Sequence, residues 1–316
     1  MYKRILSIDG GGIKGVFPAS FLSSVEEEIN GNINEYFDLI VGTSTGGIIA
    51  LGLGMGLSTK EILEFYKEYG PRIFYGDSTL TKKIRHLFYS KYDRKNLEDA
   101  LESTFGERRL GESTNRLVIP SLDINTGEVY VYKTAHNARF EKDYKKLVTE
   151  VALATSAAPT YFPTFMTRSG VPLVDGGIWA NNPTGFSVVE SIGVLGWPKD
   201  SLKVLSIGCT SEPCDMERGM GKALGIGYWG RKITDLFMRG QSSSSMGTAI
   251  LLAGKENVIR INPTVRINKY KLDRVKEIKS LEGLGETTAR NELPNLRETF
   301  FSNKVEPFTP EYQLNN

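Results

Sequence analysis

The residue of this chain best placed to do chemistry is a serine with a glycine two positions before it and another two positions after it. Gly42-Thr43-Ser44-Thr45-Gly46 is a G-x-S-x-G motif that directly follows the apolar run 37–41 and precedes helix-forming residues at 48–53. A serine on a sharp strand-to-helix turn projects its hydroxyl out of the sheet, and flanking glycines let neighbouring backbone pass close by. This context predicts that Ser44 is a catalytic nucleophile rather than part of an ordinary turn.

A glycine-rich loop near the start of the chain is the second motif. Residues 9–15 read Asp9-Gly10-Gly11-Gly12-Ile13-Lys14-Gly15, between an apolar run at 5–8 and a helix-like stretch at 17–29. Amides of such a loop at a helix N-terminus converge on negative charge. In acyl transfer that charge is the oxyanion of the tetrahedral intermediate, and each donor is worth ~3 kcal/mol. We therefore predict an oxyanion hole at Gly10, Gly11 and Gly12, with Lys14 at its rim or simply solvated.

Two other functions of this loop fit less well. Gly10-x-Gly12-x-x-Gly15 matches a dinucleotide-binding fingerprint, which needs an acidic residue at the end of the second strand. Here that strand ends at Val41-Gly42-Thr43-Ser44, without an acid. A phosphate-binding P-loop needs Ser or Thr after its lysine, but Gly15 follows Lys14. A plain turn without a ligand also remains open.

A serine nucleophile needs a base, and the chain has only two histidines. His86 lies in a basic amphipathic stretch and His136 in a polar turn, so both are predicted to be solvated surface residues. Asp175 is the alternative, because Asp175-Gly176-Gly177 follows the apolar run 171–174. Functional groups collect at strand carboxyl ends in open α/β sheets, and a desolvated aspartate can act as a base. An aspartate that only stabilises a turn is the other interpretation.

Taken together, the three motifs resemble those of the patatin-like phospholipases in order and spacing. The segment Ala154-Thr155-Ser156-Ala157-Ala158-Pro159-Thr160-Tyr161-Phe162 also resembles the part of that family that shortly precedes the catalytic aspartate. The resemblance covers roughly residues 5–210. It implies a Ser-Asp dyad without histidine that cleaves acyl esters of lipids, with Ser44 as nucleophile, Asp175 as base and the Gly10–Gly12 amides around the oxyanion. The supporting motif residues would be Asp9, Lys14, Gly15, Gly42, Thr43, Thr45, Gly46, Gly176 and Gly177. Many family members have alanine where this chain has Gly177, a departure expected to leave the chemistry unchanged.

Strand and helix signals alternate along the chain. Apolar runs at 2–8, 37–41, 116–122, 171–174 and 202–207, with an alternating stretch at 128–133, predict strands. Helical periodicity appears at 17–29, 45–55, 59–69, 94–105, 145–157 and 183–193. The alternation predicts an α/β fold of three layers, with a mostly parallel sheet between helices. We divide the chain into a catalytic domain at 1–210 and a mainly helical C-terminal extension at 211–316, with Val258-Ile259-Arg260-Ile261 as an edge strand.

Composition limits the classes of function. The chain has 316 residues, 40% of them hydrophobic, and a net charge of +2, which gives no sign of a DNA- or RNA-binding surface. Cys209 and Cys214 are expected to be free thiols without a metal, and no cofactor is implied. With no secretory signal and no run of 18 apolar residues, the expected location is the cytoplasm, peripheral at the inner membrane when active.

The last third suggests regulation. Its length and helical content resemble the bacterial patatin-like phospholipases that act as antiviral effectors when a cyclic dinucleotide activates them. Glycines at 219, 221, 225, 227 and 230 predict a linker or mobile loop, and Gln241-Ser242-Ser243-Ser244-Ser245-Met246 is either a phosphate or ribose contact or a solvated helix face. Basic clustering alone nominates Lys82, Lys83, Arg85, Arg231, Lys232 and Arg239 as anion contacts. Apolar residues that favour a lipid substrate, or are simply core, are Phe17, Tyr161, Phe162, Phe165 and Trp179. Two alternative functions stay open: a constitutive esterase, and a storage or interaction protein with marginal activity. The protein could also form a homodimer.

Overall fold

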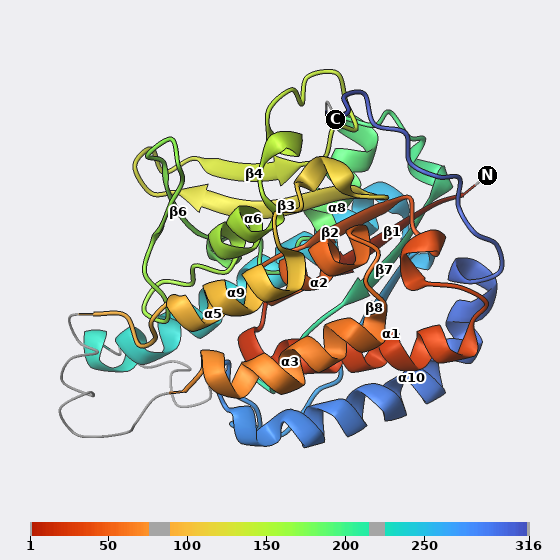
Figure 1. Ribbon diagram of the computed structural model, residues 1–316. Coiled ribbons are helices and arrows are strands. Elements are labelled where there is room, and N and C mark those ends of the chain that lie inside the picture. The colour runs from red at the N-terminus through yellow and green to blue at the C-terminus, as the bar shows by residue number, and fades with distance from the viewer. Residues whose placement is uncertain (1, 76–88, 215–224, 315–316) are drawn as a thin grey trace.

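An eight-stranded sheet forms the centre of the protein in a computed structural model that describes residues 2–75, 89–214 and 225–314, with backbone only at 226, 227, 230 and 231 (Figure 1). The strand order is β5-β6-β3-β2-β1-β7-β8, with β4 also paired to β3. The strands are β1 (Lys3–Ile8), β2 (Leu39–Gly42), β3 (Arg116–Asp123), β4 (Val129–Lys133), β5 (Phe165–Met166), β6 (Pro172–Asp175), β7 (Leu202–Ile207) and β8 (Val258–Ile261). The run β3-β2-β1-β7-β8 is parallel, whereas β4, β5 and β6 pair antiparallel.

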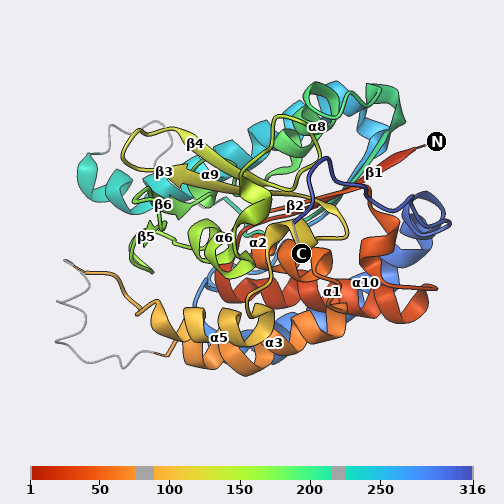
Figure 2. The ribbon, with the colours of Figure 1, turned by 45° about the horizontal axis from the view of Figure 1, so that its top comes forward.

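Helices cover both faces of this sheet, which confirms the predicted three layers (Figure 2). Alternate strand residues face opposite ways: Leu6 and Ile8 join one buried cluster, while Ile5 joins the other. The larger cluster includes residues of α1 (Val16–Glu28), α2 (Thr45–Gly54), α3 (Thr59–Ile73), α5 (Lys95–Phe105), α6 (Val148–Thr155) and α10 (Ile278–Phe300). The smaller one includes residues of α8 (Thr184–Gly193) and α9 (Ile226–Ala253). Burial on both faces explains why the central strands are continuous apolar runs.

Two strands meet end to end along one edge of β3. Val118 pairs with β2 and with β4, so these two strands lie on opposite edges of β3. Ser121 and Leu122 pair with β4 and with β6, so β6 lies on the same edge as β2. Because β2 is parallel to β3 and β6 is antiparallel to it, the carboxyl ends of β2 and β6 point at each other. The residues that follow these two ends must therefore be close in space.

The segment after residue 210 is joined to both faces and one edge of the sheet. β8 extends the sheet beside β7, as the sequence predicted for an edge strand, α9 packs on α8, and α10 packs along α1. The division at residue 210 stays a prediction. Two short elements were not predicted from the sequence: β5, with two residues, and α7 (Gly177–Ala180), with a single turn. Both are too short to show a hydrophobic period.

Two glycines of α10 test the packing of α10 on α1. A Cβ at Gly285 would lie 2.7 Å from the Ser20 Cβ and 2.8 Å from the Phe17 carbonyl oxygen, whereas a Cβ at Gly283 would meet nothing within 4 Å. Gly285→Ala should lower the free energy of unfolding by about 1–3 kcal/mol, since the two helices must separate. Gly283→Ala, the matched control, should raise it by about 1 kcal/mol through helix propensity. Thermal and urea unfolding of the two variants measure the difference, and equal effects would contradict this packing.

Candidate active site

Ser44 occupies a strained turn between β2 and α2. Its φ of 56° and ψ of −121° lie outside the regions that a residue with a side chain normally adopts. A Cβ at Gly42 would lie 2.1 Å from the Gly46 carbonyl oxygen, and a Cβ at Gly46 would lie 2.3 Å from the Ile8 carbonyl oxygen. Only glycine fits at these two positions, so the G-x-S-x-G spacing follows from the crowding of the turn.

Three threonines hold this turn in place. The Ser44 amide donates to Thr155 Oγ1 at 3.0 Å, and the Thr155 hydroxyl donates to the Pro120 carbonyl oxygen at 2.6 Å. Thr43 Oγ1 donates to the Ala180 carbonyl oxygen at 2.6 Å. On the other side, Thr45 Oγ1 donates to the Tyr66 hydroxyl at 2.6 Å. Thr155 was not singled out from the sequence as a site residue, although it lies in the segment that resembles the family.

Asp175 lies at the end of β6, near enough to Ser44 for the serine hydroxyl to act on the pKa of its carboxylate. Its side chain is buried, and the Gly177 amide donates to its Oδ1 at 2.7 Å. Burial raises the pKa of Asp175 from 3.8 to about 6, and the hydrogen bonds from Ser44 and Gly177 oppose this shift. A Cβ at Gly176 would lie 2.3 Å from the Pro120 carbonyl oxygen, so this turn also needs glycine. The arrangement places a carboxylate that can accept a proton next to the nucleophile turn.

The glycine loop lies against Ser44, but its three amides are not equivalent. A Cβ at Gly10 would be 3.2 Å from the Ser44 Cβ, which places the loop beside the nucleophile. The Gly10 amide donates to the Asn181 carbonyl oxygen at 2.9 Å, so here the structure differs from the predicted three-donor hole. Within the described parts of the chain, the amides of Gly11 and Gly12 have no hydrogen-bond partner. These two remain as predicted oxyanion donors.

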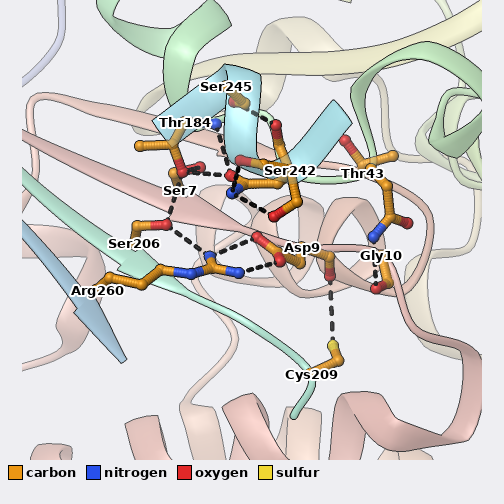
Figure 3. A network of polar contacts seen from close by, with 12 residues as sticks. Ser7, Asp9, Gly10, Thr43, Thr184, Ser206, Cys209, Ser242, Ser245 and Arg260 are labelled. Carbon is orange, nitrogen blue, oxygen red and sulfur yellow. Dashed lines mark hydrogen bonds and ion pairs between the residues drawn. The ribbon is translucent and has the colours of Figure 1, made fainter. Parts of the chain in front are cut away.

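A buried ion pair anchors the start of this loop (Figure 3). Arg260 on β8 donates through Nη1 to Asp9 Oδ1 at 2.8 Å and through Nη2 to Asp9 Oδ2, and its Nη1 also donates to Ser206 Oγ at 2.7 Å. Burial raises the pKa of Asp9 while Arg260 opposes that shift, and Asp9 in turn raises the pKa of Arg260. Asp9 therefore supports the loop rather than facing the substrate. An arginine in the middle of an apolar strand was the only sign of this pair in the sequence.

Cys209 and Lys14 lie near this ion pair. Cys209 and Cys214 are both free thiols, as expected, the first buried and the second exposed. The Cys209 Sγ lies 3.5 Å from the Asp9 carbonyl oxygen, and burial raises the pKa of this thiol to about 12. Lys14 is half-buried beside Asp9 and Cys209, on which its charge acts.

The prediction that His136 is a solvated surface residue is wrong. Its side chain is buried, with Nδ1 at 2.9 Å from Thr134 Oγ1 and Nε2 at 3.1 Å from Glu190 Oε1. Glu190 also pairs with Lys133 at 2.7 Å, and burial lowers the pKa of His136. Both ring nitrogens of His136 thus have partners away from Asp175, and the groups that act on the Asp175 carboxylate are Ser44 and Gly177. His86 lies outside the described residues.

Most of the aromatic residues that favoured a lipid substrate belong to the core. Phe17, Phe162 and Phe165 are buried in the larger cluster. Tyr161 and Trp179 are half-buried, and the Trp179 Nε1 donates to the Ser121 carbonyl oxygen at 2.9 Å. These residues therefore stabilise the fold around the site, and a lipid surface must be sought elsewhere.

Comparison with known proteins agrees with the site. The family model of the patatin-like phospholipases matches residues 6–186. The chain belongs to this family. It is therefore a phospholipase, a serine acyl hydrolase.

Two similar relatives come from bacteria. A protein of Pseudomonas aeruginosa named cGAMP-activated phospholipase is 32% identical over 280 residues, which cover 88% of this chain and 82% of the relative. A protein of the same name from Vibrio cholerae is 34% identical over 249 residues, covering 72% and 70%. Among solved structures, VipD from Legionella pneumophila has a TM-score of 0.48 at 13% identity, covering 93% of this chain and 67% of VipD.

The strain at Ser44 separates catalysis from stability. Ser44→Ala should reduce ester hydrolysis to less than a few per cent of wild type, with little change in the melting temperature, because the hydroxyl is lost and the strained backbone stays. Ser44→Gly should be equally inactive but more stable by about 1 kcal/mol, since glycine adopts a positive φ without strain. Activity assays and thermal unfolding of both variants test this, and a folded Ser44→Ala protein with substantial activity would refute the nucleophile.

The raised pKa of Asp175 predicts the pH dependence of hydrolysis. Only the carboxylate can take the serine proton, so kcat/KM should fall about tenfold per pH unit below about 6 and level off above it. Asp175→Asn should reduce activity on the order of 10³-fold or more. Because the folded pKa is raised, the folded state binds the proton more tightly than the unfolded state, and ionisation of Asp175 destabilises the fold as the pH rises from about 4 to about 6. The melting temperature of Asp175→Asn relative to wild type should therefore be higher at pH 8 than at pH 5.

A histidine variant is the control for this base. His136→Gln should lower the stability, because Glu190 loses a buried partner, yet keep kcat within roughly tenfold. A folded His136→Gln protein without activity would show that aspartate is not the base. An Asp175→Asn protein whose residual kcat/KM still falls at acidic pH as in wild type would show the same.

Proposed function

We propose that this phospholipase hydrolyses the acyl esters of membrane phospholipids through a Ser44–Asp175 dyad and is activated by a cyclic dinucleotide. The observation that carries the catalytic part is the meeting of the carboxyl ends of β2 and β6, which brings the buried Asp175 carboxylate to Ser44, whose hydroxyl acts on its pKa. A carboxylate with a pKa of about 6 is ionised at neutral pH yet basic enough to accept a proton in the transition state.

Each step of the proposed reaction uses side chains and amides of the candidate site. Asp175 takes the proton of Ser44 as Oγ attacks the ester carbonyl carbon, and the amides of Gly11 and Gly12 stabilise the oxyanion. The C–O bond to the glycerol breaks, Asp175 gives its proton to the departing alcohol, and an acyl-serine remains. Water then attacks this ester with Asp175 again as base, which releases the fatty acid and restores Ser44.

An apolar face on α9 supports contact with a membrane surface. None of the described helices is long and apolar enough to cross a membrane. The first half of α9 exposes Trp229, Ile233, Leu236 and Phe237 at spacings that put them on one side of the helix. Phe237 is 70% exposed and lies one helical turn before Gln241. The Gln241 side chain in turn donates to the carbonyl oxygen of Ile178, in the turn that follows Asp175. The apolar face thus begins one helical turn from the residue that contacts the Asp175 turn, a place where a peripheral enzyme of the inner membrane would meet lipid.

The relatives named for activation by cGAMP support the regulatory part, since one of them matches 88% of this chain. The site of the nucleotide is not assigned. Lys82, Lys83 and Arg85 lie outside the described residues, and the side chain of Arg231 is not described. Arg239 pairs with Asp235 at 2.9 Å and donates to the Glu212 carbonyl oxygen at 2.7 Å, so its guanidinium has partners within the fold. An antiviral effector role rests on the same resemblance.

Activation is tested with vesicles that contain a fluorogenic phospholipid. A saturating cyclic dinucleotide, with cGAMP tested first, should raise the rate of hydrolysis at least tenfold. A ligand that binds the active state ~2–3 kcal/mol more tightly than the inactive state shifts the equilibrium between the two states by the same free energy. Ser44→Ala protein should show the same nucleotide-induced rise in melting temperature, since the two sites are separate. Full activity without nucleotide, together with no thermal shift by any cyclic nucleotide, would instead favour a constitutive hydrolase.

Vesicle sedimentation tests the membrane face separately. Phe237→Ser should lower the fraction of protein bound to vesicles and the rate on vesicle substrate, while hydrolysis of a soluble short-chain ester stays unchanged. Val189→Ser is the matched control, because Val189 is also an exposed apolar residue but lies on α8. Equal effects of the two substitutions would contradict a specific docking face, and a wild-type protein without lipid hydrolysis under all conditions would favour a storage or interaction role.

A further inference from the structure

Only part of the serine-rich run of α9 is a solvated helix face. Ser243 and Ser244 are exposed, whereas Gln241, Ser242 and Ser245 are half-buried against the segment that follows the catalytic aspartate. Residues three and four apart lie on one side of a helix. Gln241, Ser242 and Ser245 therefore form a side of α9 that contacts protein, while Ser243 and Ser244 face solvent.

Gln241 makes the contacts nearest to the chemistry. Its Oε1 accepts from the Asn181 amide at 2.6 Å. Its Nε2 donates to the carbonyl oxygens of Gly177 at 3.3 Å and Ile178 at 3.0 Å. One side chain therefore holds three backbone groups of the turn that leads away from Asp175.

These backbone groups belong to both halves of the catalytic site. Gly177 donates its amide to Asp175 Oδ1 at 2.7 Å. Asn181 accepts the Gly10 amide at 2.9 Å, and its Nδ2 donates to the Gly10 carbonyl oxygen at 3.3 Å. Through Gly177 the side chain of Gln241 reaches the base, and through Asn181 it reaches the loop that carries the oxyanion donors.

We propose that Gln241 is a positioning residue that fixes the Asp175 turn and the Gly10–Gly12 loop relative to each other. This inference rests on the proposed roles of Asp175 and of the glycine loop. Stabilisation of an oxyanion depends on donors held in place before the reaction, within about 0.5 Å of their productive positions. The side chain of Gln241 gives α9 a direct hydrogen-bonded connection to the segment that joins the two loops.

Other contacts of α9 hold the same segment without touching the catalytic loops (Figure 3). Ser242 Oγ accepts from Asn182 Nδ2 at 3.1 Å. Ser245 Oγ donates to the Asn182 carbonyl oxygen at 2.7 Å and accepts from the Gly185 amide at 2.8 Å. Ser245 thus fixes the start of α8, and its removal provides a structural control for that of Gln241.

The test compares Gln241→Met with Ser245→Ala on a soluble short-chain ester, with cGAMP present in every reaction. Methionine keeps the volume of glutamine but neither donates to Gly177 nor accepts from Asn181. Gln241→Met should lower kcat 10- to 100-fold with KM within about threefold, because the lost interactions act on the transition state. Ser245→Ala should lower the melting temperature by at least as much, yet keep kcat within about threefold. Gln241→Asn, whose amide is withdrawn by one methylene, should lower kcat as well and serves if the methionine variant does not fold.

The pH profile gives a readout that a purely structural role would not move. Asp175 is faced by the Ser44 hydroxyl and the Gly177 amide, and among the described residues no charged side chain contributes to its pKa. A displaced Gly177 amide stabilises the carboxylate less, so the acidic limb of Gln241→Met should move to higher pH than that of wild type. The limb of Ser245→Ala should stay in place.

Two outcomes would overturn the inference. One is a folded Gln241→Met protein with kcat within threefold of wild type and an unmoved acidic limb. The other is a Ser245→Ala protein that loses as much kcat as Gln241→Met, which would indicate general loosening of α9. Ser44→Ala in the same assay separates this inference from the proposed mechanism: if that variant keeps its activity, the dyad fails, whereas an inactive Ser44→Ala beside a normal Gln241→Met rejects only the role of Gln241.

Discussion

The site depends on two strand ends that meet on one edge of β3. β2 arrives there from one direction and β6 from the other, so Ser44 and Asp175 leave their strands facing each other. The gap is narrow, and the Pro120 carbonyl oxygen lies inside it, close to Gly176 and bonded to Thr155. The required glycines and the closeness of the serine and aspartate turns both follow from this arrangement.

The same crowding sets the chemistry of the two residues. It keeps the Asp175 carboxylate away from water, and this burial raises its pKa to about 6. Ser44 remains in an unfavourable backbone conformation because β2, α2 and Thr155 fix it from three sides. Local strain and a desolvated charge are tolerated because the surrounding sheet is buried on both faces.

The sequence was sufficient to predict most strands and helices and the motifs of the site, because buried strands are apolar runs and crowded turns need glycine. It could not show the direction of β6, since an apolar run reads the same in parallel and antiparallel strands. Asp175 was predicted at the carboxyl end of a strand, and the structure adds that this strand runs antiparallel to β3. The Asn181 bond of the Gly10 amide, the burial of His136 and the partner of Asp9 depend on contacts between residues distant in the chain, which periodicity does not encode.

The ion pair between Asp9 and Arg260 has a consequence for how such enzymes can be recombined. The part of the chain that matches the family model ends at residue 186, before β7 and β8. A fragment limited to that part would leave β1 with an unpaired edge, which invites self-association, and would leave Asp9 as a buried charge without its partner. The glycine loop of the catalytic site therefore depends on β8 for the partner of its buried charge. A chimaera that received the C-terminal third of another chain would need a cation at the position of Arg260 to keep its glycine loop in place.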